Sequence, residues 1–558
     1  MKLSFWSRWG AVSLCLALLC QPSLVTAQAS LPLVTKHRAD IAVAAAATRG
    51  VPPLIASNAR RIAEVDLDLR PLLAPSALSR GRPATFVSGG FAAFQLARDL
   101  TVEVQGLRVE DTAEGNATWV GEIVWPEAGH AYVTRSPRQV FAQFELGTRR
   151  FVLQSTTNGQ SFIREVNPSG LPGCLEDTTP ASPTDKIATE PAGKVSAKNQ
   201  NGRTIDLLAL YTPAVANASY GDPTAMINNF VTGLNQSFAN SGVNGAVRVV
   251  HYALAPGVQD PVTTDDYRVT AGKMQLSSFE FSFLSSLRDQ HAADLVVLIT
   301  HAPAGAEACG FAPALMTDND PLSSINTSYA VVAANCAASD LTFTHEIGHT
   351  LGGKHDKPSY SRNEPAVYPI AYGFADRAGG SFRTIMGSSN LKGTAGFCGM
   401  SGCPRINFWS DPYRVIFIDG ANRVLGSNAE SDRSNMALTI NGGTDRFDGR
   451  SYQGTLQAVV NHRTPNYPAP GIPGTPSTVP GFLTQVSWPA ASGTVGWYEL
   501  EEDWTSSFSY PRLAYRGSAT QATVQVKCGR TYYWRVKACN GAGCSSYAVR
   551  GPEQGCSG

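Results

Sequence analysis

Residues 345–356 have the sequence HEIGHTLGGKHD, and no other stretch of the chain is as informative. On a helix, His345 and His349 lie one turn apart on the same face, so their imidazole nitrogens can reach one metal ion. The Gly-Gly pair that follows continues a helix poorly and can adopt left-handed backbone angles. We therefore expect the chain to turn there and to bring His355 to the same ion.

Three neutral imidazoles with an open fourth position are typical of a catalytic zinc site. Glu346 points roughly 100° around the helix from its neighbour, so it should miss the metal and face a water molecule at the open position. The sequence thus predicts one Zn²⁺ ion held by His345, His349 and His355. Glu346 is the predicted catalytic base.

Another class of zinc peptidase takes a downstream glutamate as its third ligand, and Glu364 stands at a suitable distance for that role. Pro358 and Pro365 would break the helix on which such a ligand normally lies. His355 already supplies the third nitrogen. The sequence therefore favours the three-histidine site.

The pattern HExxHxxGxxH is the metzincin signature, and Asp356 directly after it resembles the adamalysin or reprolysin branch. The sequence TIMG at residues 384–387 is similar to the Met-turn of that clan, in which Met386 would lie beneath the zinc. The resemblance implies a zinc metalloendopeptidase whose Asp356 supports the ligands without touching the ion. Some metzincins carry a tyrosine where this chain has Ser388, so no tyrosine is assigned to catalysis.

Strand and helix patterns alternate around the motif, which predicts an α/β catalytic domain over residues 204–463 with a mixed, mostly parallel sheet. The expected strands are 205–211, 247–254, 295–299 and 329–332, and the expected helices are 223–238, 274–293 and 343–351. The segment at residues 309–314 resembles the edge strand of the family, along which an extended substrate would lie.

The cysteines fall into one single residue and two groups of four once the first 27 residues are removed. The family resemblance suggests, loosely, that Cys309 pairs with Cys336 and that Cys398 pairs with Cys403. The four cysteines near the C-terminus allow three connectivities, which the sequence leaves open. Cys174 is the odd residue.

Residues 1–27 predict a secretory signal peptide, with a basic start, an apolar stretch and a small-residue cleavage site. The alternative, a membrane anchor, is disfavoured because the apolar stretch has about 10 residues and a span needs about 20. No later segment is long enough either. The chain is expected to be secreted.

Residues 28–203 are expected to form a β-rich pro-region that ends in a polar linker. Cys174 precedes this linker in a Pro-Gly-Cys turn. Its thiolate could occupy the open zinc position and keep a zymogen latent until the linker is cut. The alternative is a cysteine that forms a disulfide with another group or stays a buried thiol.

Six prolines mark residues 464–480 as a second linker. Residues 481–558 are rich in aromatic residues and alternate as strands, which predicts a small β-sandwich. This part resembles a fibronectin type III domain, with Tyr532 in the position of the corner tyrosine. We expect a separable module that binds or positions large substrates, with a matrix or surface ligand as a candidate partner.

The whole chain has 45 Lys and Arg against 44 Asp and Glu, a formal charge of +1, and 43% hydrophobic residues. This balance offers no broad positive field for nucleic acid. The expected partners are therefore protein or peptide substrates. The rival from another class is a non-catalytic adhesion or scaffold protein on a protease-like fold, against which the intact Glu346 argues.

Overall fold

The architecture comes from a computed structural model. It describes residues 31–75, 85–112, 115–167, 203–217, 220–302, 306–313, 328–357, 366–376, 381–388, 403–460, 462–463, 465 and 467–556. The chain divides into two units, Met1–Leu31 and Pro32–Gly558. The second unit has three parts: the N-terminal region (32–167), the central region (203–463) and the C-terminal region (467–556). Within the described residues, no helix combines the length and apolar character that crossing a membrane requires.

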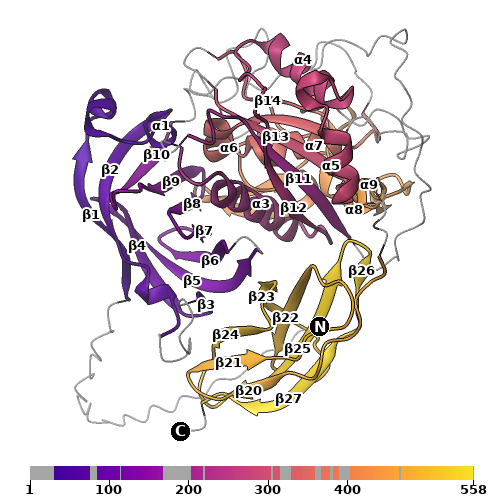
Figure 1. Ribbon diagram of the computed structural model, residues 1–558. Coiled ribbons are helices and arrows are strands. Elements are labelled where there is room, and N and C mark those ends of the chain that lie inside the picture. Colours follow the sequence, from indigo (N-terminus) through magenta and orange to yellow (C-terminus); the bar gives the residue numbers. More distant parts are fainter. Residues whose placement is uncertain are drawn as a thin grey trace, which may run out of the picture. The chain divides into compact units, whose positions relative to one another are not determined.

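The N-terminal region is a sheet of nine strands that closes on itself, since β5 pairs with both β4 and β6 at the two ends of the series. All neighbours are antiparallel except β1 and β4. It is indigo to purple in Figure 1. Its strands are β1 (Leu33–Ile41), β2 (Ala59–Leu67), β4 (Phe91–Ala97), β5 (Leu100–Asp111), β6 (Ala117–Trp125), β7 (Gly129–Arg135), β8 (Val140–Leu146), β9 (Arg149–Ser155) and β10 (Ser161–Val166).

Alternation in the sequence explains these strands. Residues 100–107, 117–124 and 150–154, whose apolar and polar residues alternate in part, lie in β5, β6 and β9. Along β5 the buried Val102 and Val104 alternate with more exposed neighbours, so one face of the strand joins the core. The short helix α1 (Pro53–Ala56) and the short strand β3 (Val87–Ser88) complete this region.

The central region holds a five-stranded sheet in the order β12-β11-β13-β15-β14, parallel except for the edge strand β14. Its strands are β11 (Thr204–Tyr211), β12 (Ala246–Leu254), β13 (Leu295–Thr300), β14 (Gly310–Phe311) and β15 (Tyr329–Ala333). Its helices are α3 (Pro223–Asn240), α4 (Thr264–Gln275), α5 (Leu284–Gln290), α6 (Ala334–Asp340), α7 (Thr342–Thr350), α8 (Met436–Asn441) and α9 (Thr455–Val460). Beyond them lie the hairpins β16 (Asp411–Ile418) with β17 (Ala421–Leu425) and β18 (Gly443–Thr444) with β19 (Ser451–Tyr452).

Helix α3 begins where the sequence predicts, because the Asp222 side chain accepts hydrogen bonds from the backbone N–H groups of the first turn and a proline opens the helix. The expectation of one helix over 274–293 is wrong. A Thr263 capping box starts α4 ten residues earlier than that range, and Ser277, at φ +47°, leaves the helical conformation. Helix α5 forms separately after this break.

The C-terminal region consists of short antiparallel strands in two sheets, coloured orange to yellow in Figure 1. Its strands are β20 (Ser477–Val479), β21 (Leu483–Ser487), β22 (Trp497–Asp503), β23 (Arg512–Gly517), β24 (Gln521–Gln525), β25 (Thr531–Asn540), β26 (Gly543–Cys544) and β27 (Ala548–Gln554). β20 lies inside the range predicted as linker, where its backbone pairs with β21. Disulfides join Cys528 to Cys556 and Cys539 to Cys544.

The C-terminal region shares both of its sheets with the N-terminal region. β23 pairs in parallel with β5, and β24 pairs in parallel with β3. Buried side chains of the two regions also belong to one apolar cluster, which contains Trp119 from the first and Trp534 from the second. The C-terminal region, which was predicted as a separable module behind the Pro-rich linker, is therefore joined by backbone pairing to the N-terminal region.

Candidate metal centre

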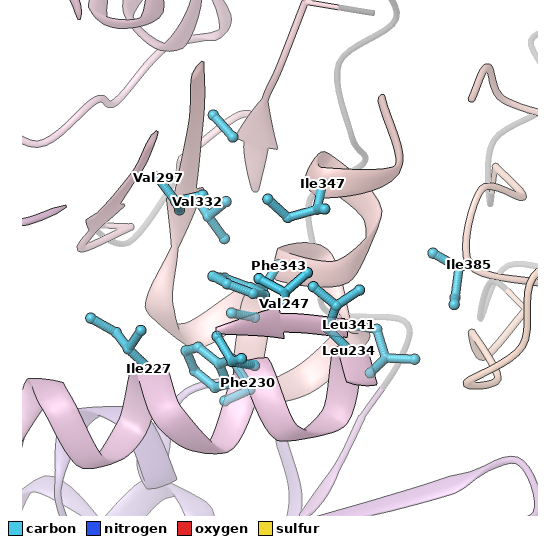
Figure 2. Close-up of a cluster of buried hydrophobic side chains, with 14 of the residues drawn as sticks. Ile227, Phe230, Leu234, Val247, Val297, Val332, Leu341, Phe343, Ile347 and Ile385 are labelled. Atoms are coloured by element: carbon cyan, nitrogen blue, oxygen red, sulfur yellow. The ribbon is translucent and has the colours of Figure 1, made fainter. Parts of the chain in front are cut away.

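Helix α7 carries the first half of the histidine motif and lies in the core of the central region. It starts directly after Leu341, which adopts φ +55° and so redirects the chain from α6. Figure 2 shows Phe343 and Ile347 of α7 beside Val332 of the sheet and Phe230 of α3. With its apolar side chains fixed in this way, α7 presents His345 and His349 from a rigid support.

The three motif histidines converge, and each offers a ring nitrogen within 4.8 Å of the others'. His345 donates from Nδ1 to the carbonyl oxygen of Ile385 at 2.7 Å, and His349 donates from Nδ1 to Gly353 at 2.8 Å. These bonds leave Nε2 of both rings free of hydrogen and able to bind a metal. Nε2 of His345 lies 3.1 Å from Nε2 of His355, a spacing suited to two ligands of one ion.

Burial keeps these imidazoles neutral, which metal ligation requires. It lowers the pKa of His349 to about 3 and holds the pKa values of His345 and His355 well below their usual range. Nearby cations act in the same direction, among them Arg405. The donor set therefore fits a divalent transition metal such as zinc.

The turn between the second and third histidines forms as the sequence predicts. Gly352 adopts φ +85°, which side-chain-bearing residues rarely do. The backbone N–H of Gly353 donates to the carbonyl of Gly348 and closes the end of the helix. The reversed chain then places His355 next to His345.

Glu346 is buried beside the edge strand β14, 1% exposed. The backbone N–H of Ala312 donates a hydrogen bond to the Glu346 carboxylate. Gly310 lies so close to this carboxylate that a Cβ there would be 2.8 Å from Oε1. Among the described residues, Oε1 has no hydrogen-bond partner. Burial raises the pKa of Glu346 to about 8, against the opposing effects of Arg405 and Ala312. A buried carboxylate oxygen beside three neutral imidazoles fits a metal with an activated water.

Met386, the residue of the predicted Met-turn, packs against the histidine helix. It is 1% exposed, and a Cβ on Gly348 would overlap its sulfur. Asp356 accepts a 2.6 Å hydrogen bond from the backbone N–H of Ser388, which ties the end of the histidine motif to the turn. The predicted supporting role of Asp356 thus has a contact that can carry it.

A buried ion cluster beside the turn was not predicted from the sequence. Asp340 lies 2.6 Å from Arg383 and 3.1 Å from Arg405. Arg383 also donates to the carbonyls of Gly387 and Cys403. No local signal could have revealed this cluster, because Asp340 and Arg383 are 43 residues apart in the chain.

Among the predicted disulfides, Cys309–Cys336 is present and links the start of β14 to α6. Cys403 is disulfide-bonded, while Cys398 lies outside the described residues. Cys174 and Glu364 also lie outside them.

Comparison with known proteins points to the same chemistry. A family model described as metallo-peptidase family M12 matches residues 201–397. A peptidyl-Asp metalloendopeptidase of Xanthomonas campestris is 24% identical over 405 residues, which cover 68% of this chain and 89% of the relative. One from Stenotrophomonas maltophilia is 25% identical over 352 residues, which cover 59% and 78%.

This chain is a metalloendopeptidase. The matched range contains the histidine helix and the turn at Met386, so the site and the family model describe the same part of the metalloendopeptidase. Among solved structures, metalloproteinase-II from Bacteroides fragilis covers 50% of this chain and 84% of its own, with 12% identity and a TM-score of 0.31.

Proposed function

We propose that the protein is a secreted zinc metalloendopeptidase of the metzincin type, made as a zymogen. The convergence of His345, His349 and His355 next to Glu346 is the observation that carries this proposal. Zinc bound by the three histidines would supply Lewis-acid activation of the scissile carbonyl and of a water molecule.

Glu346 would act on that water as general base. The backbone N–H of Ala312 orients its carboxylate, and burial keeps bulk water away from it. Glu346 then takes the proton as the water attacks and returns it to the leaving amine, so one carboxylate serves both steps. The hydrogen bonds of His345 and His349 to backbone carbonyls hold the ligand rings in place during the cycle.

The edge strand β14 is the proposed binding place for an extended substrate. Among the described residues β14 pairs with β15 alone, so its other edge would be the one that pairs with a peptide backbone. The named activity of the two relatives makes peptides with aspartate at the scissile bond the first substrates to test. Peptides with asparagine at the same place are the matched control.

Secretion and latency would depend on the first 203 residues. Residues 1–27 would direct export as a signal peptide, residues 28–203 would form the pro-region and linker, and the mature chain would begin near Thr204. Cys174 would keep the zymogen latent as a thiolate ligand of the zinc. If a Cys174→Ser proform hydrolyses peptides no faster than the unmutated proform before processing, Cys174 is not the latch.

Residues 464–476 would be a linker and residues 477–558 a fibronectin type III-like domain, since β20 pairs with β21 of that domain. The hydroxyl of Tyr532 accepts from the backbone N–H of Lys527, in keeping with a tyrosine corner. A matrix or surface ligand for this domain would increase activity on large substrates only. The domain's disulfides suit the oxidising compartment that secretion implies.

The deciding experiment measures metal and activity on the same purified protein. We expect one zinc per chain, hydrolysis of casein that stops when a zinc chelator is added, and recovery when zinc is restored. A chain that binds zinc yet cleaves neither casein nor aspartate peptides after processing would instead support the scaffold alternative. The Glu346→Gln variant controls for contaminating proteases.

A further inference from the structure

The N-terminal region shares a hydrophobic core with the histidine helix. Phe141 of β8 meets Phe230 of α3 edge to face, with ring centroids 5.9 Å apart. Phe230 in turn lies 5.9 Å from Phe343 of α7. All three rings are at least 96% buried. Removal of the N-terminal region would therefore expose apolar surface that continues into the support of the metal site.

Buried polar side chains of the N-terminal region form hydrogen bonds with the segment just before α7. Gln143 donates to the carbonyl of Ala338 at 2.9 Å, and Arg164 donates to the hydroxyl of Ser339 at 2.8 Å. Both donors are buried, Arg164 completely. The next residue is Asp340, the centre of the ion cluster that holds the Met386 turn.

Helix α3 is bound to the same closed sheet. The Asn229 amide is completely buried and donates to the carbonyl of Tyr132 and to the hydroxyl of Thr134, both at 2.9 Å. Gln154 donates to the carbonyl of Tyr220, which precedes α3. An interface of buried side chains that hydrogen-bond across it in an apolar surround resembles a domain core more than a transient contact.

The C-terminal region holds the N-terminal region from another side. Asp111 at the end of β5 accepts hydrogen bonds from the Tyr515 hydroxyl and from the backbone N–H of Ser518, both at 2.7 Å. The Arg512 side chain donates to the carbonyl of Leu107. These contacts secure the register in which Tyr515 lies opposite Val109 across the β5–β23 pair.

The C-terminal region is also fixed to the central region, so the three parts form a closed set of contacts. The Arg248 guanidinium pairs with Asp206 at 2.7 Å and lies over the Trp497 ring at 4.4 Å. Thr232 of α3 donates to the Glu110 carboxylate at 2.9 Å. Each part is therefore bound to both of the others.

We propose that the N-terminal region is a permanent subunit of the enzyme, which stays bound after the chain is cut between it and the central region. The C-terminal region retains it, because strand β23 pairs with β5 and strand β24 pairs with β3. Activation would then release the zinc site from its latch without discarding the N-terminal fold. Only the occurrence of that cut depends on the proposed function.

The test places a site for a specific protease between residues 178 and 203 in the Glu346→Gln chain. After complete cleavage, confirmed on a denaturing gel, size-exclusion chromatography with light scattering is run in native buffer. We expect one species with the mass of the uncut chain, and two fragments in concentrated guanidinium. Two separate species in native buffer would overturn the proposal. Because this variant needs no activity, failure of the peptidase assignment would leave the result intact.

A point variant tests the retaining surface. Asp111→Ala removes two hydrogen bonds to a carboxylate, so dissociation of the cut fragments should accelerate by roughly 100-fold or more. The control is Asp68→Ala, in an exposed ion pair of the same region. If Asp111→Ala changes the dissociation rate no more than Asp68→Ala does, the C-terminal region does not retain the N-terminal region.

Discussion

The histidine helix and the closed N-terminal sheet lie in one core but are encoded in different ways. All ligands of the proposed metal lie within residues 345–355, and their spacing alone brings them together. The sheet carries no chemical motif, and it reaches the site through contacts such as Gln143 to Ala338, 195 residues apart. The chemistry is therefore local in this sequence, whereas its support is distributed along the chain.

The largest effect should come from the locally encoded histidine helix. Glu346→Gln keeps the three ligands but removes the proton acceptor, so kcat/KM should fall by about 10² to 10⁴ at unchanged zinc content. Metal analysis and peptide hydrolysis on the same sample measure both. The assignment of Glu346 fails if more than a tenth of the activity survives at full zinc occupancy.

His349→Ala is the matched control, since it removes a ligand and should lose the metal together with the activity. The pair of variants thus separates metal binding from proton transfer. Equal zinc loss in both would show that Glu346 supports the ligands instead of acting as a base.

The convergence of the three histidines could be predicted from the sequence because helical geometry turns spacing into proximity. The bend at Gly352, the start of α3 at Pro223 and the pairing Cys309–Cys336 are found as expected. The break of the predicted 274–293 helix was not foreseen, because a serine with φ +47° has no distinctive local signature. The zinc, Glu346 and Cys174 roles stay predictions.

Contacts between distant segments could not be predicted from one sequence. The pairing of β5 with β23 joins residues about 400 positions apart, and neither strand differs in pattern from an ordinary half-buried strand. The arginine that pairs with Asp340 could not be predicted either, because many arginines of the chain are equally plausible partners. Such choices are settled by packing of the whole chain.

The second prediction tests the ion cluster that joins the histidine helix to its support. Arg383→Gln leaves Asp340 with less compensation in a buried place and removes a donor to Gly387, so unfolding free energy should fall by about 3 kcal/mol. Urea unfolding followed by fluorescence measures this. Arg70→Gln breaks an exposed ion pair in the N-terminal region and should leave the free energy of unfolding nearly unchanged. A similar small change in both would show that the cluster is not a support.

The third prediction concerns the space between the histidine helix and the Met386 turn. A Cβ at Gly348 would overlap the Met386 sulfur and lie 2.8 Å from the Trp409 ring, so Gly348→Ala should cost about 1 to 3 kcal/mol. Gly272→Ala in α4 meets no atom within 4 Å and should be neutral or stabilising. If Gly348→Ala were as harmless as its control, the turn would not lie tightly under the helix in solution.

The smallest effect should come from the distributed support. Gln143→Ala leaves the carbonyl of Ala338 without its buried donor, which should cost about 1 kcal/mol of stability. Because Ala338 lies only a few residues before α7, a further loss in kcat with unchanged KM would show that the N-terminal sheet positions the site.

The control for this last variant is Gln160→Ala, in an exposed turn of the same sheet, where the side chain accepts a hydrogen bond from Asn158. Both variants remove one glutamine from one region, and they differ in whether the lost bond crosses to the central region. Equal kcat values for Gln143→Ala and Gln160→Ala would confine the sheet to a stabilising role. A lower kcat for Gln143→Ala alone would show that contacts far apart in the sequence tune a locally encoded centre.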